Sequence, residues 1–180
     1  MAALTKTWIG CAPGNFAQGR GPYKPLGICI HLMQGTLIGT DNWFGSATAQ
    51  VSAHYGIGKQ GQIHQYVKED DRAYHAGRMD PDPPTLALLA ANPGVNPNDI
   101  LIGIEHEGFV DEAWPDEMIE ASARLIADIA QRWLIPLDFD HVVRHHDIYA
   151  PKACPGPLAP MDALLAKAKS YYTADGPQTT

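Results

Sequence analysis

The alternation of apolar and polar positions predicts strands interspersed with helices along most of the chain. Two short apolar runs, at 26–32 and 100–104, have the length and the branched residues of buried strands. The segments 51–59 and 62–67 flank Gln60-Gly61, a pattern that indicates a β-hairpin. Two further strands are expected: an edge-like run at 5–9, and a run at 141–146 that delivers its last residues to a loop over 147–160.

The longest expected helix begins near Pro115 and is closed by Pro136. Its apolar residues recur at spacings of three and four, which is typical of a helix with one buried face. Shorter helices are expected at 41–49, with Asp41 as the N-cap, and at 85–91 and 161–172. Together these elements predict one α/β domain over 1–172, with a central mixed β-sheet flanked by helices, and a polar tail over 173–180.

Composition narrows the possible functions. The chain has 180 residues, which suits one domain, and its charge is 13 − 20 = −7. This charge argues against a nucleic-acid binder and against adhesion to an anionic membrane. No apolar run approaches the length of a membrane span, so we expect no membrane insertion, and we expect a monomer. Residues 1–16 do not read as a secretory signal, so synthesis in the cytoplasm is expected.

Two motif-like patterns are rejected on their context. Gly56, Gly58 and Gly61 spell G-x-G-x-x-G, but a strand rather than a helix is expected after them, so they are assigned to the hairpin. His106-Glu107 begins like the zinc motif H-E-x-x-H, but Val110 stands where the second histidine belongs. Neither a dinucleotide site nor that type of zinc site is expected.

A different set of residues has the character of a metal site. Catalytic zinc takes three protein ligands and keeps one position open. His31 and His146 each stand where an expected strand emerges, and Cys154 lies in a loop stiffened by prolines. His145 should point to the opposite face of its strand, so only one of the two neighbouring histidines should bind metal. Cys11 and Cys29 are expected to be free thiols, because three cysteines do not form a disulfide framework.

Five stretches then give a specific resemblance. The chain resembles the zinc-dependent N-acetylmuramoyl-L-alanine amidases, a family that includes phage lysozyme-type amidases, the bacterial anhydro-muropeptide amidase and the peptidoglycan-recognition proteins. The stretches occur in the order of the family and span most of the chain: I-C-I-H at 28–31, V-S-A-H-Y-G-I-G-K-Q-G-Q-I at 51–63, R-A-Y-H-A-G at 72–77, N-D-I-L-I-G-I-E-H-E-G at 98–108 and H-D-I-Y-A-P-K-A-C-P-G at 146–156.

The resemblance implies a role for each matched residue. His31, His146 and Cys154 match the zinc ligands. Glu105 matches the general base of the anhydro-muropeptide-type enzymes, Lys152 the residue that faces the reacting carbonyl, and His75 a histidine that lines the substrate groove. The phage lysozyme-type enzymes have a catalytic tyrosine where this chain has Ala53, which shifts the expected chemistry onto Glu105.

The implied function is hydrolysis of the amide between N-acetylmuramic acid and L-alanine in peptidoglycan. We expect a phage or prophage endolysin that acts on the cell wall after release. One alternative is a cytoplasmic amidase that recycles soluble anhydro-muropeptides. A second alternative is a module that binds peptidoglycan or a muropeptide without cutting it; zinc content separates that module from an enzyme.

Overall fold

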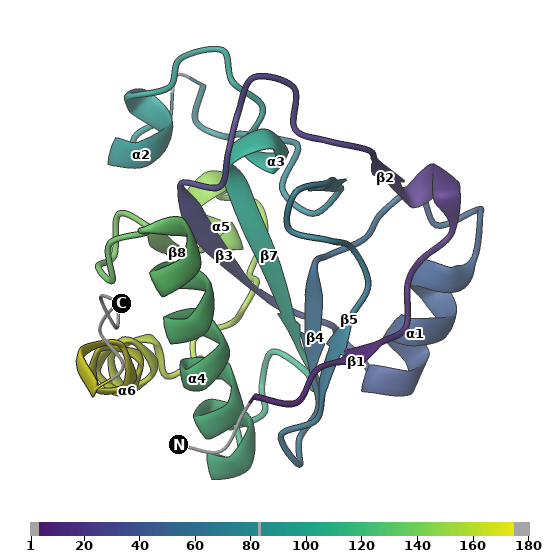
Figure 1. Ribbon diagram of the computed structural model, residues 1–180, viewed down its shortest axis with the longest axis vertical. Helices are drawn as coiled ribbons and strands as arrows, with labels where there is room; N and C mark the ends of the chain where they lie inside the picture. Colours follow the sequence, from purple (N-terminus) through teal and green to yellow (C-terminus); the bar gives the residue numbers. More distant parts are fainter. Residues whose placement is uncertain (1–3, 83, 175–180) are drawn as a thin grey trace, which may run out of the picture.

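A computed structural model describes residues 4–82 and 84–174 of the chain. Its main sheet is mixed, with the strand order β1-β5-β4-β7-β3-β8 (Figure 1). β7 pairs in parallel with both β3 and β4, whereas β4 and β5 form the antiparallel hairpin. The bounds of these strands are β1 Thr7–Trp8, β3 Gly27–Leu32, β4 Tyr55–Ile57, β5 Ile63–Gln65, β7 Leu101–His106 and β8 Val142–Arg144.

The two longest strands, β3 and β7, separate two faces of the sheet. Ile28 and Ile30 belong to the same core cluster as Ile102 and Ile104, together with the apolar face of the long helix α4, Asp116–Trp133. The C-terminal helix α6, Met161–Ala174, packs beside α4 over this face (Figure 1). Since side chains alternate along a strand, the odd-numbered residues of β3 and β7 face the other side of the sheet. His31 and Glu105, which the sequence analysis singled out, lie on that second face.

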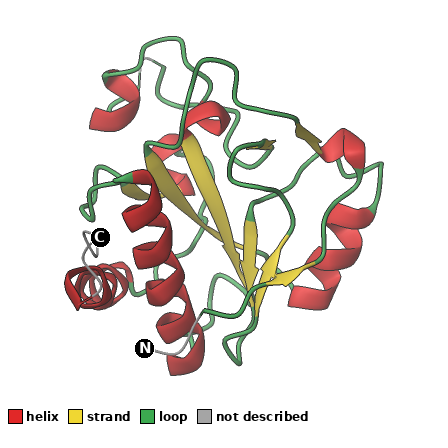
Figure 2. Cartoon of the chain, in the orientation of Figure 1, coloured by secondary structure: helices red, strands yellow, loops and turns green. Residues whose placement is uncertain are grey.

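Several short helices and strands lie in the segments between the strands of the main sheet (Figure 2). A small second sheet pairs β2 with β6 in antiparallel register. No helix among the described residues has both the length and the apolar character that a membrane crossing requires. The bounds of the remaining elements are η1 Pro13–Asn15, β2 Phe16–Ala17, α1 Leu37–Gly45, β6 Arg72–Ala73, α2 Ala87–Ala90, α3 Pro97–Ile100 and α5 His145–Ile148.

The predicted fold class is confirmed. Several strands and helices are shorter than predicted, among them β4 and α2, and two boundary errors change the position of a polar side chain. The helix expected at 41–49 begins one turn earlier, because Thr36 caps it by accepting the Gly39 N–H at 3.0 Å. Asp41 is therefore inside α1, where its carboxylate bonds His64 and Tyr66. The strand expected over 141–146 ends at 144, and the one-turn helix α5 follows without a gap. Of the polar tail predicted over 173–180, residues 175–180 lie outside the described residues.

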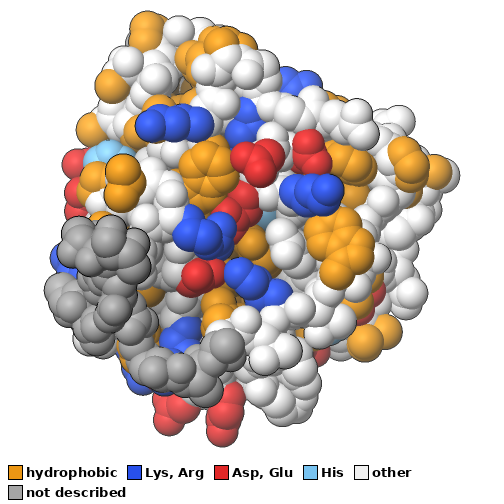
Figure 3. Space-filling view, viewed as in Figure 1, with side chains coloured by type: hydrophobic (Ala, Val, Ile, Leu, Met, Phe, Trp, Pro, Cys, Tyr) orange, Lys and Arg blue, Asp and Glu red, His pale blue; other side chains and the backbone are white. Residues whose placement is uncertain are grey.

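An ion cluster ties α4 to the loop after β5. Glu69 is 6% exposed and accepts hydrogen bonds from Tyr55, Arg132 and Trp133. Burial alone would raise the pKa of Glu69, but these hydrogen bonds outweigh burial and lower it. Basic and acidic side chains lie side by side near the middle of this face of the molecule (Figure 3). The cluster stabilises the packing of the long helix against the hairpin.

We expect Arg132→Met to lower the free energy of unfolding by about 1–2 kcal/mol at pH 7, because hydrogen bonds to a charged group are lost. This loss of stability is small for a hydrogen-bonded charge because the Arg132 side chain is 41% exposed and water screens its charge. The lowered pKa of Glu69 means that its contribution is complete above the unfolded value of about 4.3 and disappears as the pH falls through the folded value. Urea unfolding at pH 7 and pH 3 tests this, and an undiminished difference at pH 3 would contradict it.

Candidate metal centre and active site

Three metal-ligating side chains meet at the second face of the sheet. His31 is near the end of β3, His145 is the first residue of α5, and Cys154 comes from the loop that follows. One ligand atom from each lies within 4.8 Å of the other two. The Nδ1 atom of His31 is 3.9 Å from the Sγ atom of Cys154, and the rings of His31 and His145 are 4.6 Å apart between centroids. Strand end, helix start and loop thus converge on one point.

His146 was the predicted ligand, but the structure brings its neighbour His145 to His31 and Cys154. The prediction assumed that strand alternation continues through both histidines, but β8 ends at Arg144 and α5 begins at His145. His146 instead supports the ligand loop: its backbone N–H donates to the Cys154 carbonyl at 2.9 Å, and its Nδ1–H donates to the Lys152 carbonyl at 2.7 Å. Only one of the two histidines joins the cluster, as expected.

The protonation states of the three donors suit a cation. Burial lowers the pKa of His31 well below that of free imidazole, and burial followed by Lys152 lowers the pKa of His145 to about 4. Both rings are therefore neutral at pH 7 and each has a lone pair to share. Burial raises the pKa of the Cys154 thiol to about 12, whereas the Leu32 N–H, 3.1 Å from Sγ, favours the thiolate. A bound cation would displace the thiol proton.

The spacing of the donors also fits zinc. Typical zinc–nitrogen and zinc–sulfur bonds at a tetrahedral angle place a nitrogen and a sulfur ligand about 3.6 Å apart. The 3.9 Å between His31 Nδ1 and Cys154 Sγ is close to this value. Two imidazoles and one thiolate are three protein ligands, the number that leaves a fourth position for water or substrate. The residues present therefore fit a catalytic zinc ion.

Glu105 lies beside this cluster, and one of its carboxylate oxygens makes no hydrogen bond with the described residues. It is in register with His31 across the β3–β7 pair, on the same face of the sheet. Its Oε2 atom is buried and has no hydrogen-bond partner among the described residues. Burial raises the pKa of the carboxyl to about 8, and the positive charge of Lys152 opposes that rise. A carboxyl in this state is suited to exchange protons near neutral pH.

The neighbouring carboxylate has a different task. Glu107 follows Glu105 by two residues, and its Oε2 accepts the backbone N–H of Lys59 at 2.8 Å. His106, between them, points to the other face, where its Nε2 lies 2.8 Å from the hydroxyl of Ser122 in α4. The structure thus places Glu105 at the cavity and Glu107 at the hairpin.

A cavity of about 330 Å³ opens over the cluster. Glu105 and Lys152 line it together with the three metal-ligating residues, so the reactive groups share one space. Its apolar wall suits a substrate that carries both polar and apolar groups. The remaining lining residues are Leu32, Met33, Gln34, Phe44, Val51, Ser52, Tyr74, His75 and Ala153.

His75 lines this cavity, and it also contacts His31 of the cluster. Its Nδ1 atom is 3.0 Å from the Nε2 atom of His31. Burial, and after it the charge of Arg20, lowers the pKa of His75 to about 3, so the ring is neutral. The Nε2 atom of His75 is buried without a hydrogen-bond partner among the described residues.

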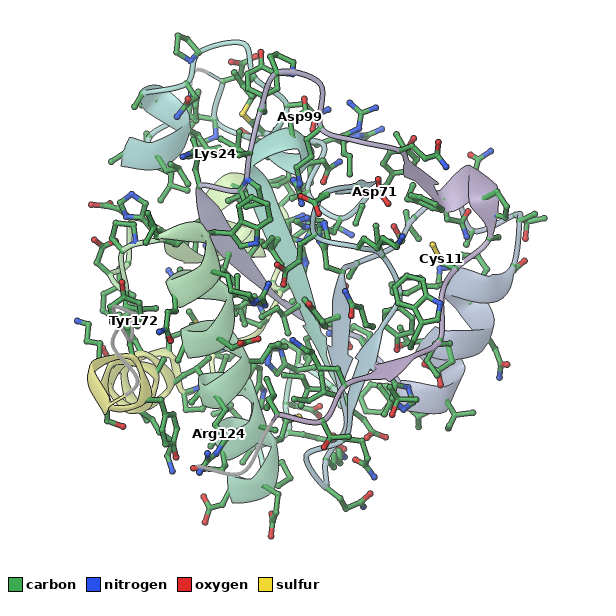
Figure 4. All side chains as sticks on the ribbon, in the orientation of Figure 1. Cys11, Lys24, Asp71, Asp99, Arg124 and Tyr172 are labelled. Atoms are coloured by element: carbon green, nitrogen blue, oxygen red, sulfur yellow. The ribbon has the colours of Figure 1, made fainter. Side chains whose placement is uncertain are left out.

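The two other cysteines do not belong to the three-residue cluster, although Cys29 comes within 4.8 Å of His31. Cys11 packs against a small apolar group that includes Phe44 and Tyr66, between β1 and α1 (Figure 4). Cys29 is fully buried on β3, two residues before His31 and on the same face. Both are free thiols, as expected.

A buried arginine behind the site escaped the sequence analysis. Arg20 is 5% exposed and donates to the carbonyls of Glu69, Asn98, Asp99 and Leu101. The negative charges of Asp71 and Asp99, both labelled in Figure 4, favour the charged form of Arg20 against burial. Only its position in a Gly- and Pro-rich stretch was visible in the sequence, and such stretches usually lie on the surface.

A second and larger cavity, of about 700 Å³, lies away from the reactive cluster. His146 faces this cavity rather than the metal-ligating residues, together with Arg144 and Asp147, which form an ion pair with each other. Volume alone would favour this cavity as the functional site. The convergence of metal-ligating, acidic and basic side chains identifies the smaller one instead.

Comparison with known proteins agrees with this geometry. A family described as N-acetylmuramoyl-L-alanine amidase matches residues 21–157. The chain is 39% identical over 128 residues to N-acetylmuramoyl-L-alanine amidase A of Achromobacter lyticus. That alignment covers 69% of this chain and 61% of the relative, so the chain spans about three fifths of the length of that protein.

Solved structures share the fold. A selenomethionine derivative of AmpD has a TM-score of 0.72 at 24% identity, and the match covers 93% of this chain and 95% of AmpD. The amidase LysC from Clostridium intestinale has a TM-score of 0.66 at 18% identity, with 93% and 99% covered. AmiD from E. coli, solved with the substrate anhydro-N-acetylmuramic acid-L-Ala-D-γ-Glu-L-Lys, has a TM-score of 0.62 at 27% identity, with 79% and 57% covered. The chain belongs to the N-acetylmuramoyl-L-alanine amidase family.

Proposed function

We propose that this protein is a zinc-dependent amidase that hydrolyses the bond between the lactyl group of N-acetylmuramic acid and L-alanine. The observation that carries the proposal is the arrangement of His31, His145 and Cys154 next to a buried Glu105 oxygen without a partner. Family membership supplies the substrate class. Zn²⁺ bound by the three residues would supply a Lewis acid that polarises the amide carbonyl and acidifies water.

The protein side chains carry the proton transfers. Glu105 accepts a proton from the attacking water and delivers it to the leaving nitrogen of L-alanine. One water is consumed, the carbon–nitrogen bond breaks, and a lactyl carboxylate and a free amine result. Lys152 lines the same cavity and offers a positive charge to the oxygen of the scissile carbonyl, where negative charge develops.

The biological substrate is the finer part of the proposal. We propose wall peptidoglycan, cut by a phage or prophage lysin, with soluble anhydro-muropeptides in a recycling pathway as the alternative. Equal amounts of muramoyl-alanine amide, presented as intact sacculi or as soluble fragments, distinguish the two settings. Faster release of L-alanine amino groups from sacculi supports the lysin, and cleavage confined to soluble fragments supports recycling.

Removal of the metal tests the proposal directly. We expect prolonged dialysis against a chelator to abolish amide hydrolysis, because the carbonyl is no longer polarised, and one equivalent of Zn²⁺ to restore it. Amino groups released from peptidoglycan measure the activity, and circular dichroism confirms that the apo-protein stays folded. Peptidoglycan binding without hydrolysis by the zinc-loaded protein would instead identify a binding module.

A further inference from the structure

We propose that His75 is a positioning residue that holds the His31 ring in the tautomer and orientation required for metal binding. The inference rests on the proposed metal site, and it assigns to His75 a task other than contact with substrate. The observation that carries it is the 3.0 Å contact between His75 Nδ1 and His31 Nε2. Partners of this kind on the second nitrogen of a metal-binding histidine fix its tautomer and raise its basicity.

The chemistry of the two rings leaves one consistent arrangement. His31 directs its Nδ1 towards Cys154 Sγ, so Nδ1 must keep its lone pair for a metal. A neutral imidazole carries one proton, which then resides on Nε2 and is donated to His75. His75 Nδ1 must accept this hydrogen bond, and its own proton therefore resides on Nε2, the buried nitrogen that has no hydrogen-bond partner among the described residues. The proton of His31 is directed away from the ligand atoms.

The fold holds His75 in place from two sides. Asn98, in α3, accepts the backbone N–H groups of His75 and Ala76 through its Oδ1 atom, at 3.1 and 2.7 Å. The His75 ring lies on Gly103 of β7, where an added Cβ would be only 2.6 Å from the ring Cγ. The rings of His31 and His75 meet edge to face at 88°. Such support is expected for a residue whose orientation matters.

A competing arrangement uses the same side chains as ligands. Cys29, His31 and His75 also place one ligand atom each within 4.8 Å of one another. A metal held there would take the opposite nitrogen of His31 and would need the thiolate of Cys29 rather than that of Cys154. The two arrangements therefore predict different sulfur ligands, and variants of the two cysteines separate them.

Three substitutions of His75, compared by their metal affinity, test the proposal. His75→Leu removes the acceptor and should weaken Zn²⁺ binding about 10- to 100-fold, measured by chelator competition. His75→Asn places its amide oxygen where Nδ1 stood and should recover most of that loss. His75→Gln carries the same group one bond further along, at the position of Nε2, and should not recover it. A purely structural role would give Asn no advantage over Gln.

The visible spectrum of the Co²⁺-substituted protein gives a readout that is independent of activity. We expect the d–d bands to shift in His75→Leu and to return towards the wild-type spectrum in His75→Asn, with the thiolate charge-transfer band retained in both. Cys29→Ala should leave the spectrum and the affinity unchanged. Circular dichroism first establishes that His75→Leu is folded. The proposal would be overturned if this folded variant kept the wild-type Zn²⁺ affinity, or if Cys29→Ala lost the thiolate band.

The wild-type protein separates this inference from the proposed function. One bound Co²⁺ per chain with the expected response to the His75 substitutions, but without hydrolysis of any muropeptide, would refute the amidase and leave the positioning role intact. Failure of the wild-type protein to bind Co²⁺ or Zn²⁺ would overturn both.

Discussion

His145→Ala is expected to abolish metal binding and amide hydrolysis, whereas His146→Ala should retain both. His145 supplies one of three converging ligand atoms, and loss of a direct ligand should exceed the 10- to 100-fold effect typical of an outer partner. The His146 side chain contributes one hydrogen bond to the ligand loop instead, from Nδ1 to the Lys152 carbonyl, so its removal should cost about 1 kcal/mol of stability. Zinc content after gel filtration and initial rates on peptidoglycan measure the contrast.

The pair is a matched control, because adjacent histidines are replaced by the same residue. Retained zinc and activity in His145→Ala, combined with their loss in His146→Ala, would show that the strand register continues past Arg144 and that the helical start of α5 is wrong. Thermal unfolding of both variants separates a loss of ligand from a loss of fold.

Glu105→Gln is expected to lower the rate of hydrolysis by about 10²- to 10⁴-fold, because the amide cannot accept a proton from water. Zinc affinity should stay close to that of the wild type, since Glu105 is not one of the three converging ligands. Stability should not fall, because the substitution replaces a buried oxygen that has no partner among the described residues. Rates at saturating substrate, with metal content measured in parallel, test the expectation.

Glu107→Gln, two residues after Glu105 and just beyond the end of β7, is the control for this substitution. Its carboxylate accepts the Lys59 N–H in the hairpin, so the change should affect stability by about 1 kcal/mol and leave the rate of hydrolysis near that of the wild type. Equal losses of rate in the two variants would indicate that negative charge near the site, rather than proton transfer by Glu105, is what matters.

Much of the site could be predicted where a local pattern decides the position of a side chain. His31 and Glu105 lie on two parallel strands that the buried apolar runs predicted, and the family resemblance singled out both residues. Cys154 followed from the resemblance of its proline-rich loop.

The pattern failed where one element changes into another within a residue. The choice of His146 extended strand periodicity past Arg144, but helix α5 starts at His145 and turns the next side chain away. The helix start at Asp41 was wrong for a related reason, since Thr36 offers the same type of cap one turn earlier. Boundaries of this kind depend on which of two competing local hydrogen bonds wins.

Contacts between distant segments were beyond the sequence pattern. The hydrogen bond between His75 and His31 joins residues 44 positions apart. It also requires a glycine at position 103, because a Cβ there would collide with the His75 ring. The burial of Arg20 depends on carbonyls from two segments about 50 and 80 residues away. Neither arrangement leaves a periodic trace along the chain.

The most direct test of the central claim is the identity of the product. A defined muropeptide is incubated with the zinc-loaded protein in H₂¹⁸O, and the fragments are analysed by mass spectrometry. The account predicts one ¹⁸O atom in the lactyl carboxylate of N-acetylmuramic acid and a stem peptide with a free L-alanine amine, both absent with His145→Ala. Cleavage of a glycosidic bond or of another peptide bond, or the same products from His145→Ala, would contradict it.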